Sequence, residues 1–349
     1  ANYDRRLADQ ATQHLSTQLD LPAWGVQQWQ IGADWHHERL VQLLNGVSEF
    51  TGSDGVTRES SELFAQNDIF LASQWELLIG LRYQNDSDFG DHFAPKASLR
   101  WTFMDNAEWN GALRLSAGQG YRVPNLKERY YLFDHSSIGY KVQGNPNLRP
   151  ESSNSYQLGA TLRLHKTLTL DANIFYNDVT DLIQTDMNNF TVINGVAIYT
   201  YENIAHARTS GLESAVNWQA TPALNISSAY TWTQTKDVNT GTQLTRRPEH
   251  IARFGVDWLM HKTRFTLRER YQSDELAITG SNARSPAWAV TDISVTQEIN
   301  GGVSAFLGVN NVFGQQRDFS QPADFGPIAG RYIYLGATWS WDSQNSTEK

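Results

Sequence analysis

His135 is the residue whose type and surroundings point most directly to chemistry. A neutral imidazole is a common ligand for iron, and three tyrosines lie near it in the sequence, Tyr130, Tyr131 and Tyr140. Aromatic rings grouped in this way can stack on a flat ligand. The alternative is that His135 orders a local turn and that the tyrosines form the core of a loop. The stretch is therefore a candidate ligand-binding site, with His135 as its candidate metal ligand.

Two proline-containing segments flank this stretch. Tyr121-Arg122-Val123-Pro124 precedes it, and Asn145-Pro146-Asn147-Leu148-Arg149-Pro150-Glu151 follows it. Proline fixes φ and removes a backbone donor, so the prolines end strands and stiffen the base of a loop. Arg122 and Glu151 are expected to pair across that base. An architectural role is favoured over ligand contact for the residues of both segments: Tyr121, Arg122, Pro124, Asn145, Pro146, Leu148 and Glu151.

Several classes of function are disfavoured by composition. The chain of 349 residues has no Cys, which excludes thiol catalysis and Cys-ligated metal sites. Its net charge of −9 argues against a nucleic-acid partner. His37-Glu38-Arg39-Leu40-Val41 begins like a zinc-protease motif but lacks the second His. We find no catalytic constellation and expect no enzyme activity.

In the segments that must position these residues, apolar and polar residues alternate with a period of two. Mean hydropathy is −0.50, and no apolar run is long enough for a membrane helix. Apolar and polar residues instead alternate over long segments, which indicates β-strands with one apolar face. In the segment 168–177, one face carries Leu168, Leu170, Ala172, Ile174 and Tyr176, and the other carries Thr169, Asp171, Asn173, Phe175 and Asn177.

Fourteen strands are predicted on this basis, and residues 10–19 are a candidate for a fifteenth. The predicted strands are 27–43, 61–71, 74–84, 94–103, 107–118, 154–164, 167–183, 199–218, 223–235, 249–258, 262–271, 287–298, 302–313 and 330–341.

The connections between these strands alternate in length. Short gaps such as 104–106 and 259–261 alternate with long ones such as 85–93, 119–153 and 184–198. Short turns at one rim and long loops at the other are typical of an outer-membrane β-barrel. A soluble β-sandwich would also alternate, but strands of about 10 residues are long for a sandwich. The predicted fold is therefore all-β, a transmembrane antiparallel barrel surrounded by outer-membrane lipid.

The polar face of the strands carries many arginines. A charge that faces lipid at the midplane costs about 2–4 kcal/mol, so we expect these side chains to face a wet interior. They are Arg82, Arg100, Arg114, Arg163, Arg253, Arg268 and Arg270.

The motifs resemble those of one known family. Besides the two flanking segments, Phe175-Tyr176-Asn177-Asp178, Arg208-Thr209-Ser210-Gly211 and Gly308-Val309-Asn310-Asn311 are similar to TonB-dependent outer-membrane receptors. The resemblance runs over essentially the whole chain. It implies an outer-membrane receptor of a Gram-negative bacterium that takes up a ferric siderophore or haem. In haem receptors of this family a His lies between two such segments, as His135 does, so His135 is the metal ligand if haem is bound.

The resemblance also implies partners and a domain organisation. Such receptors have about 22 strands around a plug that contacts TonB, and the barrel-assembly machinery inserts them. We find no plug-like segment in these residues, so residues 1–341 are expected to form the barrel portion, with a polar tail at 342–349. No intrinsic cofactor is implied. Three alternatives remain. They are another cargo of the same family, such as cobalamin, a passive porin-like channel, and a truncated or purely structural barrel portion with no transport of its own.

Overall fold

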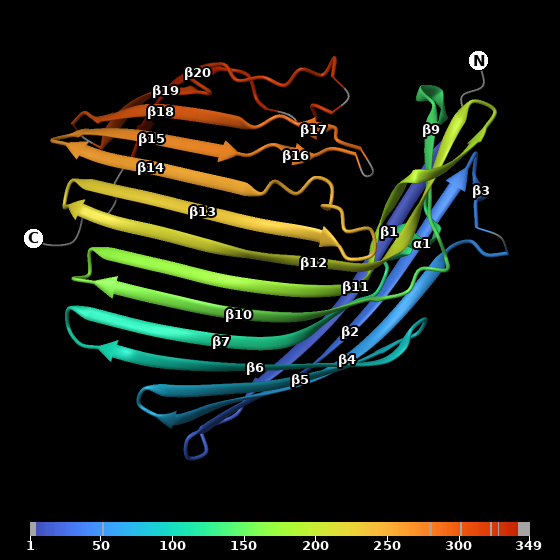
Figure 1. Ribbon diagram of the computed structural model, residues 1–349, viewed down its shortest axis with the longest axis horizontal. Helices are drawn as coiled ribbons and strands as arrows, with labels where there is room; N and C mark the ends of the chain where they lie inside the picture. Colours follow the sequence, from blue (N-terminus) through green and yellow to red (C-terminus); the bar gives the residue numbers. More distant parts are fainter. Residues whose placement is uncertain are drawn as a thin grey trace, which may run out of the picture.

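The computed structural model describes residues 5–50, 52–278, 281–300, 302–321, 323–326 and 328–340. Trp341 and the expected tail at 342–349 lie outside these residues. The described chain is almost entirely β-structure (Figure 1). No helix within it is long and apolar enough to cross a membrane.

Fifteen strands of eight or more residues form the body of the structure. They are β1 (Arg6–Asp20), β2 (Gln27–Leu44), β4 (Val56–Ala72), β5 (Trp75–Asp86), β6 (Gly90–Asp105), β7 (Trp109–Arg122), β10 (Glu151–Leu164), β11 (Leu168–Ile193), β12 (Val196–Thr221), β13 (Leu224–Asp237), β14 (His250–Met260), β15 (Thr263–Gln272), β18 (Trp288–Glu298), β19 (Val303–Asn310) and β20 (Tyr332–Trp339). The expected fifteenth strand at 10–19 is confirmed as β1.

Smaller elements lie in the loops at one rim. They are β3 (Val47–Ser48), α1 (Leu126–Tyr130), β8 (Leu132–His135), the 3₁₀ turn η1 (Ser136–Ile138), β9 (Tyr140–Gln143), β16 (Glu275–Leu276) and β17 (Arg284–Ser285).

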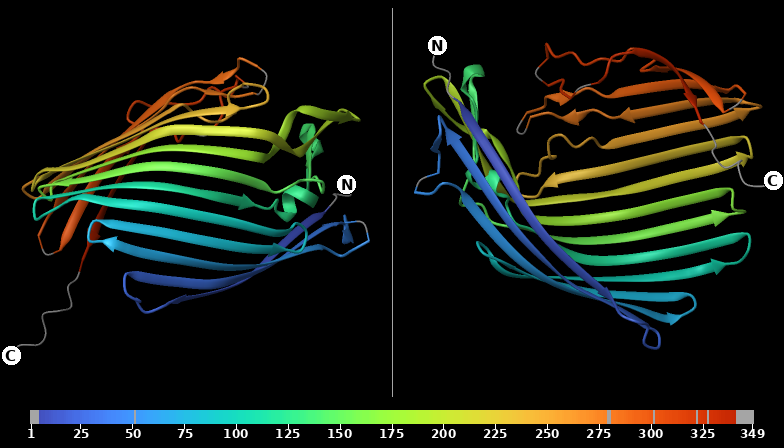
Figure 2. Two further views of the ribbon diagram at one scale, coloured as in Figure 1. Left: turned by 60° about the horizontal axis from the view of Figure 1, so that its bottom comes forward. Right: turned by 180° about the vertical axis from the view of Figure 1, so that it is seen from behind.

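Each long strand pairs antiparallel with its neighbours along the chain, from β1 to β20. The resulting sheet curls strongly, with the short turns at one rim and the loops at the other (Figures 1 and 2). Among the described residues, β1 and β20 do not pair with each other, so each has a free edge. The expected antiparallel barrel wall is confirmed.

One face of the sheet is apolar from strand to strand. Apolar residues that pair directly with one another form an unbroken row across eight strands, from β4 to β13. This face is exposed in the isolated chain, for example 57% for Ile174, as is typical of a barrel wall that faces lipid. The row consists of Ile69, Leu77, Leu99, Leu115, Leu158, Ile174, Leu212 and Trp232.

The opposite, concave face is polar, as the sequence predicts for the wet interior. Most of the strand arginines there pair with carboxylates of neighbouring strands. Arg268 contacts Asp257 at 2.8 Å and Arg270 contacts Asp292 at 3.1 Å.

Two segments predicted as long loops, 85–93 and 184–198, are hairpins, so these two predictions are wrong. The segment 85–93 is a tight hairpin in which Asp86 pairs with Gly90. The side chain of Asp86 accepts hydrogen bonds from the amides of Asp88 and Phe89, which closes the turn. The segment 184–198 is not a loop either, because β11 and β12 continue outward as a long hairpin. Its turn is Asn194-Gly195, and both residues have positive φ (52° and 79°), as a two-residue hairpin turn requires.

Candidate functional site

The longest connection, residues 123–150, is a folded strap across the concave face at the loop rim. It contains α1, β8, η1 and β9. Asn125 and Glu128 form a capping box that starts α1. At the base of the strap, Arg122 donates to Glu151 at 2.7 and 2.5 Å, and it also contacts Glu128. The expected pairing of Arg122 with Glu151 is therefore confirmed, and it links the base to the helix.

A small, dry core holds the strap against β2. Leu40 and Leu126 are fully buried and Leu148 is 3% exposed. The fully buried side chain of Gln42 donates to the carbonyl of Leu132 at 2.6 Å and accepts from its amide at 2.9 Å. This amide replaces a neighbouring strand as the hydrogen-bonding partner of β8. Buried polar groups of this kind are costly unless paired, so the contact fixes the position of β8.

The strap also joins two distant parts of the sheet. Asp134 contacts Arg6 of β1 at 3.2 Å and Lys141 at 2.9 Å. On the other side β9 pairs in parallel with β12, Tyr140 with Ala197. β1 and β12 are eight strand pairings apart in the sheet, and Figure 1 shows β9 and α1 between their loop ends.

Asp134 is held ionised by this arrangement. Burial by itself would raise the pKa of Asp134. Hydrogen bonds from Lys141, Ser136 and Arg6 outweigh that effect and hold the pKa well below its usual range. The amide of Ser136 donates to Asp134 at 2.9 Å, so Asp134 and not His135 orders the turn.

The strap brings most of the predicted ligand contacts together. The ring of His135 lies between those of Phe133, 4.2 Å away, and Tyr140, 5.3 Å away and nearly parallel. Tyr131 lies 6.5 Å from Phe133. Among the described residues, none forms a hydrogen bond with the ring nitrogens of His135. We call Phe133, His135 and Tyr140 the aromatic face of the strap.

Tyr130 belongs to a different environment. Its ring packs against the guanidinium of Arg129, 4.8 Å away, and edge-on against Phe50. It therefore lies in the packing of the strap base, away from the aromatic face.

The other residues of the flanking segments have structural contacts. Tyr121 stacks on His92 at 3.7 Å, and Pro124 is fully buried and accepts from Arg58 through its carbonyl. The side-chain amide of Asn145 donates to the carbonyl of Tyr201 on β12 at 2.8 Å, and Pro146 lies in the turn that follows. These contacts support the architectural interpretation.

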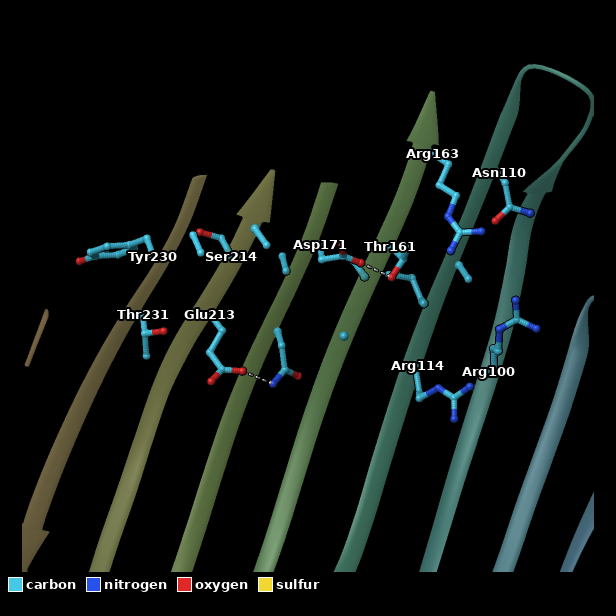
Figure 3. Close-up of a pocket in the computed structure, with 18 residues that line it drawn as sticks. Arg100, Asn110, Arg114, Thr161, Arg163, Asp171, Glu213, Ser214, Tyr230 and Thr231 are labelled. Atoms are coloured by element: carbon cyan, nitrogen blue, oxygen red, sulfur yellow. Dashed lines mark hydrogen bonds between the residues drawn. The ribbon is translucent and has the colours of Figure 1, made fainter. Parts of the chain in front are cut away.

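A recess of about 560 Å³ lies on the polar side chains of β6, β7 and β10–β13 (Figure 3). Arg100, Arg114 and Arg163 line one side. Asp171 and Glu213 line the other, and they accept hydrogen bonds from Thr161 at 2.7 Å and Asn173 at 3.3 Å. Within the described part of the chain, neither Arg114 nor Arg163 has a carboxylate partner. The interior wall is therefore polar and strongly patterned in charge.

Metal binding by a cluster of side chains is not supported. In residues 5–340, apart from the undescribed positions, no group of three or more His, Asp or Glu could hold a metal ion.

Comparison with known proteins identifies the family. A family model described as TonB dependent receptor-like, beta-barrel, matches residues 1–312. The chain belongs to this family. Its place as a TonB-dependent receptor barrel agrees with the exposed apolar row and with an outer-membrane location.

Individual relatives have low sequence identity to this chain, but the matches cover most of it. The chain is 25% identical over 321 residues to the iron-regulated outer membrane virulence protein of Vibrio cholerae, which covers 87% of this chain and 48% of that protein. It is 23% identical over 388 residues to the ferrienterobactin receptor of Escherichia coli, covering 95% and 50%. The chain thus spans about half the length of the curated relatives it matches.

Solved structures share the fold. The siderophore receptor PirA of Pseudomonas aeruginosa superposes with a TM-score of 0.74 at 21% identity, covering 96% of this chain and 57% of that one. The two chains therefore share the β-barrel fold over nearly the whole length of this one.

Two residues that hold the site cannot be predicted from the sequence pattern. Gln42 and Arg6 lie in strands about 90 and 130 residues before their partners in the strap. Nothing in the local pattern distinguishes them from other polar residues of the barrel interior.

Proposed function

We propose that this chain is the barrel portion of a receptor that takes up an iron complex in a TonB-dependent manner. The observation that carries the proposal is the aromatic face of the strap, Phe133, His135 and Tyr140, fixed across the loop rim by a buried core. The barrel itself performs no chemistry. Its role is to capture the complex at the rim and to provide the wall of the route inward. Contact with TonB belongs to a plug, which the family resemblance implies.

A ferric siderophore is the cargo that fits this face best. Such a complex brings its own iron ligands, so it needs no metal site in the protein. This agrees with the described residues, which contain no group of three or more His, Asp or Glu that could hold a metal ion. The rings of Phe133 and Tyr140 can stack on aromatic groups of the complex. Two of the curated relatives are named as iron-regulated and ferrienterobactin proteins, which supports this class of cargo.

Haem is the second candidate, and one observation favours it. The nitrogens of His135 have no hydrogen-bond partner among the described residues, so one of them is free to ligate haem iron. The flat macrocycle would then rest against the neighbouring rings of the aromatic face.

Two variants of the full-length receptor separate these cargoes. Tyr140→Leu removes a stacking ring and should weaken binding of a catecholate siderophore by about 0.5–1.5 kcal/mol. His135→Ala should leave the siderophore nearly unaffected. If haem is the cargo, His135→Ala should instead weaken haem binding by about 1–3 kcal/mol and shift the Soret band of the bound haem.

His14→Ala is the matched control, because His14 lies on β1 and contacts His36 rather than the strap. Unchanged binding of both ligands in Tyr140→Leu and His135→Ala would refute a binding role for the aromatic face.

A further inference from the structure

The lipid-facing side of the sheet has a defined outer boundary. Tyr156 of β10 and Tyr176 of β11 pair directly, with ring centroids 6.4 Å apart, and Tyr230 and Trp232 follow on β13. Tyrosine and tryptophan concentrate where acyl chains meet headgroups. These rings therefore mark the level of the outer-leaflet interface on β10–β13.

Two cations lie just beyond this aromatic level on the same outward face. Arg208 of β12 and Lys236 of β13 are directly paired, and both are exposed. Arg208 is two residues beyond Ser210, which pairs with Tyr176. We call Arg208 and Lys236 the outer-rim basic pair.

The two positive charges of this pair are only partly balanced in the isolated chain. Like charges directly opposite each other on a sheet destabilise it. Arg208 donates through Nε to Asp178 at 2.9 Å, while Lys236 has no ion-pair partner in the part of the chain that the structure describes. An anion bound between the two cations would remove the repulsion.

The space around the pair is suited to a phosphate with part of its carrier. A recess of about 490 Å³ is lined by Tyr176, Arg208, Ser210, Gln234 and Lys236 among others. Arg208, Ser210, Gln234 and Lys236 carry hydrogen-bond donors, as a phosphate requires. The hydroxyl of Tyr176 donates to Asp178 at 3.3 Å, the carboxylate that also accepts from Arg208. The one carboxylate in the lining, that of Glu249, accepts from the indole of Trp232 at 3.1 Å.

We propose that the outer-rim basic pair binds a phosphate group of the lipopolysaccharide that forms the outer leaflet around the barrel. The position at the headgroup level, the adjacent cations and the donor-lined recess all match a phosphorylated lipid headgroup. The site faces lipid, on the opposite side of the wall from the strap, and it does not depend on which cargo the receptor takes up.

The test measures binding of lipid A to the full-length protein in detergent by native mass spectrometry. The probes are bisphosphorylated lipid A, the same lipid without its phosphates, and inorganic phosphate. The variants are Lys236→Gln, Arg208→Gln and their combination. Lys166→Gln is the control, because Lys166 lies in the short turn between β10 and β11 at the opposite rim.

Each removed cation should weaken lipid A binding by about five-fold, or about 1 kcal/mol, and the double variant by about 25-fold. The control should bind as the wild type does, and wild-type binding of the dephosphorylated lipid should be as weak as lipid A binding to the double variant.

Three results would overturn the proposal. These are equal binding of phosphorylated and dephosphorylated lipid by the wild type, a Lys236→Gln variant within two-fold of the wild type, and inorganic phosphate binding as tightly as lipid A. The lipid comparison uses the wild-type protein, so it decides the matter even if a variant folds poorly.

Discussion

Gln42 is the residue through which the position of the strap can be tested most sharply. Its buried side chain makes two hydrogen bonds with the backbone of Leu132, at 2.6 and 2.9 Å. Gln42→Met keeps a side chain of similar length but removes both partners. The partly buried amide and carbonyl of Leu132 would then lose their hydrogen-bond partners, at a cost of up to about 1–3 kcal/mol each. We expect docking of the strap to weaken by about 2–6 kcal/mol.

Hydrogen–deuterium exchange of the full-length protein in detergent measures this directly. A loss of 2 kcal/mol corresponds to about 30-fold faster exchange of protected amides, and it should be confined to residues 126–143. The strands of the barrel should retain their protection, since they do not depend on the strap for their ladders.

Gln30→Met on the same strand is the matched control. The side chain of Gln30 donates to the exposed Asp20 at the short-turn rim, so its loss should cost little. Equal exchange in the strap of Gln42→Met and wild type would refute the view that this buried amide holds β8 in place. Faster exchange across the whole barrel would show instead that the strap and the sheet unfold together.

Two further outcomes follow from the faces of the sheet and from the charge of Asp134. Leu335→Lys should lower the yield of heat-modifiable barrel, because Leu335 is 81% exposed on the lipid face and a midplane charge costs about 2–4 kcal/mol. Thr338→Lys, on the other face of β20, should not lower it, and equal losses would refute the assigned faces. Because the pKa of Asp134 is lowered in the folded state, the stability it contributes is complete above its unfolded value of about 4 and is lost as pH falls below that. A dye attached through Ile138→Cys, in a chain without other cysteines, should therefore report release of the strap only in acid, and Asp134→Asn should remove that pH dependence.

The strand pattern could be predicted because each strand carries its own evidence. Ile174 and Tyr176 differ in polarity from Asp171 and Asn173 whatever their neighbours are, so the faces follow from the sequence alone. The rims were harder to predict. The dipeptide Asn194-Gly195 is a signal for a hairpin turn. The alternation of short and long connections nevertheless predicts a long loop there, so the hairpin of β11 and β12 is missed.

The candidate site was predictable in position but not in construction. The flanking segments indicated a stiff loop base, and Arg122 does pair with Glu151 there. The grouping of His135 with Phe133 and Tyr140 depends on the β8–β9 hairpin, in which His135 pairs with Tyr140. Tyr130 lies on α1 and not in the β8–β9 hairpin, so its ring packs on Arg129 and Phe50 and does not join the aromatic face. Whether His135 binds a cargo stays a prediction.

The strap connects the aromatic face to distant strands of the wall. The aromatic face has few groups to hold it except the strap's own contacts, and those contacts reach β1, β2 and β12. A ligand bound to this face would therefore be connected through fixed contacts to strands that are eight pairings apart in the sheet. A flexible loop of the same length would not provide that connection.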